Sequence, residues 1–299
     1  MRIDPVSALV APIAGIGVTH ELHDGIGLEA AMRPAWPGTS SDREPLVIRH
    51  ELGITRPSGM NPVLTVPPWC TFHVDSRGEP ASLFPAVFGE VERLLTCERP
   101  GRRYVVRYGS APRGPVEALQ SELTAFSFAL AARGLGFIAH SCAFVLPNGS
   151  GVVCPGTSGA GKTTLARLLR DAVPDVDVLT DDRAIVTLDD RLTAWGSPWP
   201  GAAGIATPDG APLDVIMFIR HGRDPSIRRV RPRDAFRRVI NTLSMPLWEP
   251  ARCGRALEIV DAIVTRPVVV EVTYPPTAGA ARWLSNELAV MACEVHVAA

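Results

Sequence analysis

The chain has 299 residues, with 30 Lys and Arg against 31 Asp and Glu and a formal net charge of −1 at pH 7. Apolar residues make up 46% and charged residues 20%, which is the composition of a folded globular protein and excludes a disordered chain. A net charge near zero argues against a protein that binds nucleic acid or an anionic membrane over its whole surface. The length allows one large domain or two modest ones.

The N-terminus shows no targeting signal that we recognise. Its apolar run over residues 8–18 is interrupted by Pro12 and follows Asp4, and no 18-residue apolar stretch exists to cross a membrane. The six cysteines are scattered without a CxxC pair, so we expect free thiols in a reducing compartment and no zinc framework. The protein is therefore expected to be cytoplasmic, with no membrane partner.

The first part of the chain is predicted to be rich in strands. Residues 1–45 contain many Gly and Pro and no long periodic segment. Short β-like runs follow between residues 46 and 108, interrupted by one helical pattern at 84–95. We assign residues 1–110 to a smaller N-terminal part that could bind an acceptor, form a homo-oligomer interface or complete the fold.

Residues 111–299 have the pattern of an α/β sheet domain, because strand-like runs are mixed with helices. The spacing predicts a helix over 116–133. Further strands are predicted at 140–146, 152–154, 176–179, 184–188, 215–220 and 268–272, and further helices at 162–171, 234–243, 253–264 and 278–292.

A glycine-rich motif lies between one of these strands and the next helix. It fits GxxxxGK[ST] in full over Gly156, Thr157, Ser158, Gly159, Ala160, Gly161, Lys162 and Thr163, and Thr164 continues into the helix. Such a loop presents backbone N–H groups to phosphate oxygens, while the lysine reaches the outer phosphates and the threonine hydroxyl binds Mg²⁺. Lys162 is the only lysine in the chain. The motif predicts binding of ATP with Mg²⁺.

An acidic pair, Asp181 and Asp182, follows the strand-like run 176–179, about twenty residues after Lys162. A carboxylate at the end of a strand beside a phosphate loop is placed to hold Mg²⁺. A second one can accept the proton of an attacking hydroxyl. The residues alone do not decide which Asp has which role.

Together, His140, the glycine-rich loop and the Asp pair resemble the HPr kinase/phosphorylase group, over roughly residues 115–288. The resemblance implies a P-loop kinase domain of the HPr kinase/PEP carboxykinase type. It also implies that Asp181 is the base, that Asp182 lies at or near the metal, and that His140 lies near the transferred phosphate.

The chain departs from the bifunctional members of that group. Thr164 stands where they carry Glu, and their signature segment has no counterpart, which argues against phosphorolysis and against HPr as the acceptor. The chain is more similar to the shorter HPr-kinase-like relatives, which include kinases that modify a serine of lasso-type precursor peptides.

Eight arginines lie within residues 220–238, namely Arg220, Arg223, Arg228, Arg229, Arg231, Arg233, Arg237 and Arg238. Guanidinium groups suit phosphates or the carboxylates of an acidic peptide, so Arg220, Arg223 and Arg228 are candidate substrate contacts. A solvated surface is the alternative. Nucleic acid is disfavoured because no stacking aromatics accompany the charge.

The leading hypothesis is an ATP- and Mg²⁺-dependent kinase that phosphorylates a Ser or Thr hydroxyl of a protein or peptide. The alternatives are a kinase of a small hydroxylated metabolite such as free serine, and a non-catalytic nucleotide-binding regulator.

Overall fold

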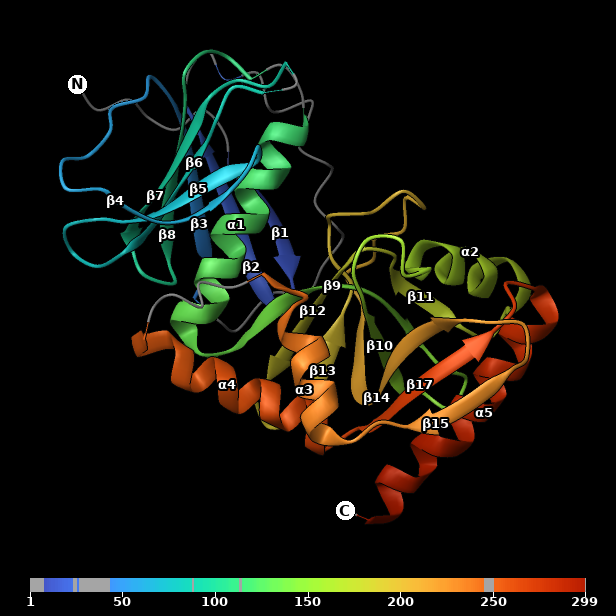
Figure 1. The fold of residues 1–299 in the computed structure, drawn as a ribbon. Helices are drawn as coiled ribbons and strands as arrows, with labels where there is room; N and C mark the ends of the chain where they lie inside the picture. Colours follow the sequence, from blue (N-terminus) through green and yellow to red (C-terminus); the bar gives the residue numbers. More distant parts are fainter. Residues whose placement is uncertain are drawn as a thin grey trace. The chain divides into compact units, whose positions relative to one another are not determined.

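The computed structural model describes residues 8–23, 26, 44–87, 89–112, 115–244 and 250–298. In this part the chain is mixed α/β, as the sequence predicts, and it has two sheets and five helices (Figure 1). The chain divides into two compact units, residues 1–133 with 246–250 and residues 134–245 with 251–299.

The first unit is built on an eight-stranded sheet in the order β1-β2-β3-β8-β7-β6-β5-β4. Its strands are β1 (Ala8–Ile13), β2 (Ile16–Leu22), β3 (Leu46–Leu52), β4 (Asn61–Val66), β5 (Cys70–Val74), β6 (Pro80–Phe84), β7 (Arg93–Arg99) and β8 (Arg103–Tyr108). Helix α1 (Pro115–Arg133) packs on this sheet through Phe128, whose ring centroid lies 6.3 Å from that of Phe72 and 6.4 Å from that of Tyr104. The predicted helix over 116–133 is confirmed, but its contacts place it in the first unit, whereas we assigned it to the second domain.

One sequence prediction in this unit is wrong. The helical pattern at 84–95 is the end of β6, a connection and the start of β7. Leu94 and Leu95 are adjacent and both fully buried, so this strand is covered on both faces and its apolar run imitates helical spacing. The Gly- and Pro-rich start contains the β1–β2 hairpin, whose turn at Ala14 and Gly15 has positive φ at both residues.

The second unit is built on a nine-stranded mixed sheet with the main order β10-β9-β12-β13-β14-β17-β15. Its strands are β9 (Gly136–Val145), β10 (Gly151–Pro155), β11 (Asp177–Thr180), β12 (Arg183–Leu188), β13 (Leu192–Trp195), β14 (Gly210–His221), β15 (Ser226–Arg229), β16 (Leu243–Ser244) and β17 (Val268–Tyr274). Strands β10, β14 and β17 are parallel to one another, so their carboxyl ends lie at one edge of the sheet.

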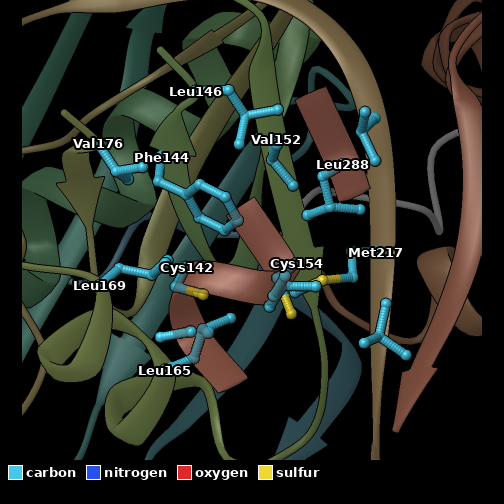
Figure 2. Close-up of a cluster of buried hydrophobic side chains, with 14 of the residues drawn as sticks. Cys142, Phe144, Leu146, Val152, Cys154, Leu165, Leu169, Val176, Met217 and Leu288 are labelled. Carbon is cyan, nitrogen blue, oxygen red and sulfur yellow. The ribbon is translucent and has the colours of Figure 1, made fainter. Parts of the chain in front are cut away.

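Helices cover both faces of this second sheet. Helices α2 (Lys162–Ala172) and α5 (Ala278–Ala298) pack on one face, where Leu165 and Leu288 join a buried cluster with Phe144 and Val152 (Figure 2). Helices α3 (Pro232–Ile240) and α4 (Pro250–Thr265) supply side chains to the cluster on the other face. All four lie close to the predicted helices. Within the described ranges, no helix has the length and apolar character that a membrane span requires.

A chain of buried polar groups runs through the first unit. The ring of His50 is hydrogen-bonded to His20 (Nε2–Nδ1, 3.0 Å) and to the Tyr108 hydroxyl (Nδ1–Oη, 2.9 Å). Glu122 Oε2 lies 3.9 Å from His20 Nε2, which is too far for a hydrogen bond. Burial therefore dominates both groups: it raises the pKa of Glu122 to about 8 and lowers the pKa of His20 to about 3. The fold thus holds both groups in their neutral forms near pH 7.

This burial predicts a pH dependence of stability that one substitution removes. Native Glu122 keeps its proton up to about pH 8, whereas an unfolded glutamate loses it near the model value of 4.5. The native state binds more protons between these values, so the free energy of unfolding falls as pH rises, by up to ~1.4 kcal/mol per pH unit. Glu122→Gln should abolish this slope in urea unfolding of the first unit between pH 7 and 8, where unfolded His20, with an ordinary pKa of 6.5, has already lost most of its proton.

The matched control is Glu287→Gln, at an exposed position on α5, which should keep the wild-type slope. An unchanged slope in Glu122→Gln would show that this carboxyl is not the buried proton carrier.

Candidate functional site

Strand β9 changes its neighbours on both edges at His140 and Ser141. On one edge, the Gly156 N–H donates to the His140 carbonyl (3.1 Å) and the His140 N–H donates to the Thr242 carbonyl (2.8 Å). On the other edge, the Ser141 N–H donates to the Asp182 carbonyl (3.0 Å). The glycine-rich loop, the acidic pair and the end of the α3 segment are therefore held at one point of the sheet.

The glycine-rich loop, residues 156–161, joins β10 to α2 in a tight turn. Gly159 has φ 81° and Gly161 has φ 98°, conformations that other residues rarely adopt. A Cβ on Gly156 would lie 2.9 Å from the Ala160 Cβ, which is closer than such atoms approach. The glycines of the motif are thus required by the path of the backbone.

Lys162 is the first residue of α2 and is buried beneath this loop. Its Nζ donates hydrogen bonds to the carbonyls of Gly156 (2.7 Å) and Thr157 (3.0 Å). Burial lowers the pKa of Lys162, and the negative charge of Asp182 opposes that shift. The only lysine of the chain therefore places its amine against the carbonyls of the loop.

A cavity of about 220 Å³ lies over the loop and the start of α2. It brings together most of the residues predicted from the sequence: His140, Ser158, Gly159, Ala160, Gly161, Lys162, Thr163, Thr164 and Asp182. The first two residues of the motif, Gly156 and Thr157, line a neighbouring cavity of about 260 Å³ instead.

Asp182 is held in this cavity as a carboxylate. Its Oδ1 lies 2.9 Å from His140 Nε2, and its Oδ2 lies 2.5 Å from Arg183 Nη1. Burial alone would raise the pKa of Asp182, but the hydrogen bond from His140 and the charges of Arg183 and Lys162 outweigh it, so the pKa lies below its ordinary value. Arg183 was not among the site residues predicted from the sequence, where its place directly after the two acids was the one available signal.

Asp181 points elsewhere and is fully buried. Its carboxylate accepts three backbone N–H groups, from Gly201 (2.8 Å), Ala203 (2.7 Å) and Ile205 (3.2 Å). The pair lies in the bend between β11 and β12, and its two carboxylates have separate partners: Asp181 binds the 201–205 loop and Asp182 binds His140 and Arg183. The structure places Asp181 as an anchor of the 201–205 loop, outside the cavity of Lys162 and Asp182, so it does not favour the role of base that the resemblance implies.

The predicted arginine contacts lie outside this cavity. Arg228 donates to the buried Glu271 (Nε–Oε1, 2.8 Å), and Arg220 Nη1 lies 3.8 Å from the same oxygen. Arg223 is exposed between β14 and β15. Arg238, which was not among the predicted contacts, lines the cavity of Gly156 and Thr157.

The oxygen donors at the cavity fit a magnesium ion better than a transition metal. They are the Thr163 hydroxyl and the Asp182 carboxylate, and Mg²⁺ commonly takes one or two protein oxygens and completes its shell with phosphates and water. Across the described ranges, no three His, Cys, Asp or Glu side chains form a cluster that could hold a metal without such help.

A scan against protein-family models gives no match for this chain, and a search of curated proteins gives none either. The case for a function therefore depends on the residues and their geometry.

The division of the acidic pair predicts different effects on stability. Asp181→Asn replaces an accepting oxygen by an NH₂ group that would face a backbone N–H, so it should lower the free energy of unfolding by ~1–3 kcal/mol. Asp182→Asn affects a partly exposed group with fewer buried partners and should cost less. Urea unfolding, with hydrogen exchange of the Gly201, Ala203 and Ile205 amides, measures both effects. Equal protection of these amides in the two variants would contradict the anchoring role.

Proposed function

We propose that the second unit is a P-loop kinase domain of the HPr kinase/PEP carboxykinase type, which transfers the γ-phosphoryl group of ATP to a Ser or Thr hydroxyl of a protein or peptide. One observation carries the proposal: the glycine-rich loop, Lys162, His140 and Asp182 line a single cavity. This combination supplies an anion site and a proton acceptor side by side.

On the donor side, the loop and the N-terminus of α2 would bind the phosphates. Backbone N–H groups that are free at a helix N-terminus, together with the helix dipole, favour a polyanion there. The Lys162 amine would exchange its two loop carbonyls for phosphate oxygens, which are stronger partners because they are charged. A bound Mg²⁺ would neutralise charge on the phosphates, with the Thr163 hydroxyl as its ligand from the loop.

On the acceptor side, Asp182 would accept the proton of the attacking hydroxyl. Its lowered pKa keeps it ionised, and His140 and Arg183 hold its two oxygens in position. The bond to the γ-phosphorus forms at the hydroxyl oxygen as the bond to the β-phosphate oxygen breaks, and the hydroxyl proton passes to the carboxylate. Positioning and charge neutralisation carry most of such a reaction, so a weak base is sufficient.

A peptide acceptor is supported by the space beside the cavity. The neighbouring cavity of about 260 Å³ also borders the loop, since Ala160 lines both. Free serine would leave this second space unfilled, whereas residues flanking a serine in a peptide could occupy it.

The test is transfer of label from γ-labelled ATP with Mg²⁺ to serine-containing peptides, to HPr and to free serine. Asp182→Asn should lower transfer by ~10²-fold or more while ATP binding is retained, because the substitution removes the proton acceptor and leaves the loop intact. Asp190→Asn, at an exposed position, is the matched control and should transfer at the wild-type rate.

The other outcomes are equally informative. Label on free serine alone would make the protein a metabolite kinase. Full transfer by Asp182→Asn would remove Asp182 from the reaction. A changed Mg²⁺ requirement in this variant would assign Asp182 to the metal.

A further inference from the structure

A charged hollow of the second unit lies between β15 and α3, apart from the cavity of Lys162. It has a volume of about 570 Å³. We call it the arginine cavity, and its lining residues are Arg228, Arg229, Val230, Arg231, Asp234, Arg237 and Arg238. Five guanidinium groups and one carboxylate make it a site for anions.

A buried carboxylate fixes the inner wall of the arginine cavity. Glu271 on β17 accepts hydrogen bonds from Arg228 (2.8 Å) and Arg238 (2.7 Å). Burial would raise the pKa of Glu271, but the two arginines outweigh it and hold the pKa below its ordinary value. One carboxylate thus positions two guanidinium groups and leaves positive charge in excess.

On the outer wall of the arginine cavity, the arginine side chains form ion pairs with carboxylates near the protein surface. Arg231 pairs with Asp234 across 2.9 Å and is itself 86% exposed, and Arg229 pairs with Glu294 at the surface. Within the described part of the chain, Arg237 has no carboxylate partner. Exposed ion pairs contribute little to stability, so a ligand carboxylate can replace these partners at small cost.

The arginine cavity adjoins the region of the glycine-rich loop. Arg238 lines both the arginine cavity and the 260 Å³ cavity, and Ala160 lines both the 260 Å³ cavity and the cavity of Lys162 and Asp182. Three hollows that share walls therefore lead from Asp182 along the loop to α3.

We propose that the arginine cavity binds acidic side chains of the peptide acceptor and so places its hydroxyl at Asp182. This inference rests on the proposed kinase function and names the substrate class: a Ser- or Thr-containing peptide with Glu or Asp residues near the phosphorylated position. Guanidinium groups bind carboxylates through paired hydrogen bonds, which gives both affinity and orientation.

Nucleic acid fits the same cavity less well. Binding of single strands relies on exposed aromatic faces for base stacking. Phe218, the aromatic residue of the neighbouring cavity, is buried, and the Arg238 guanidinium lies over its ring at 5.0 Å from the centroid. No aromatic residue lines the arginine cavity as the structure describes it.

The experiment measures binding of a fluorescent hexaglutamate peptide to the full chain by anisotropy, without nucleotide. Hexaglutamine and an oligothymidylate of equal charge are the comparison probes. Hexaglutamate should bind at least tenfold more tightly than hexaglutamine, with an affinity that falls as salt rises. The double variant Arg231→Gln/Arg237→Gln should weaken hexaglutamate binding tenfold or more, since it removes two charged donors.

The control is Arg170→Gln, at an exposed position on α2, which should bind as the wild type does. Equal affinity for the two peptides, or unchanged binding by the double variant, would overturn the proposal. Tighter binding of oligothymidylate than of hexaglutamate would overturn it in favour of nucleic acid. Because no nucleotide is present, these results are independent of phosphoryl transfer, and a failure here is distinct from a failure of the kinase assay.

Discussion

The site depends on the backbone of two residues, His140 and Ser141. Their N–H and carbonyl groups bond on one edge to Gly156 and Thr242 and on the other edge to Asp182. These are obligatory partners, because buried backbone groups must be hydrogen-bonded. Segments far apart in the sequence are thereby fixed at the place where β10 gives way to the glycine-rich loop. The backbone alone therefore brings His140 and Asp182 to the same cavity, where the His140 ring contacts the Asp182 carboxylate directly.

This backbone arrangement also places the charged groups of Lys162 and Asp182 at the same cavity. Lys162 and Asp182 are both partly shielded from water, so each moves the pKa of the other toward its charged form. Asp182 is also held by His140 and Arg183, whereas Lys162 is bonded to neutral carbonyls only. An anionic ligand would therefore stabilise the Lys162 amine more than it would stabilise any group that already has a charged partner. At the arginine cavity, Glu271 of β17 likewise holds two guanidinium groups, those of Arg228 on β15 and Arg238 on α3.

The α/β class of the second unit and the position of the glycine-rich loop could be predicted from the sequence. The glycine-rich motif has fixed spacing, and its strand–loop–helix context was found where expected. The division between Asp181 and Asp182 was not predictable, because it depends on the 201–205 loop folding back over Asp181. Local patterns also cannot show that β7 is buried on both faces or that α1 packs with the first sheet. In each case a long-range contact decides the outcome.

Equilibrium binding of ATP to the full chain tests the central claim most directly, with titrations in the presence and absence of Mg²⁺ on the wild type and on Lys162→Met. The account predicts that the wild type binds ATP, and that Lys162→Met binds ~10²-fold more weakly because a buried charge-assisted contact to phosphate is lost. The variant should retain the wild-type far-ultraviolet circular dichroism spectrum. A folded variant that binds ATP as tightly as the wild type would contradict the account, and so would a wild type that does not bind ATP.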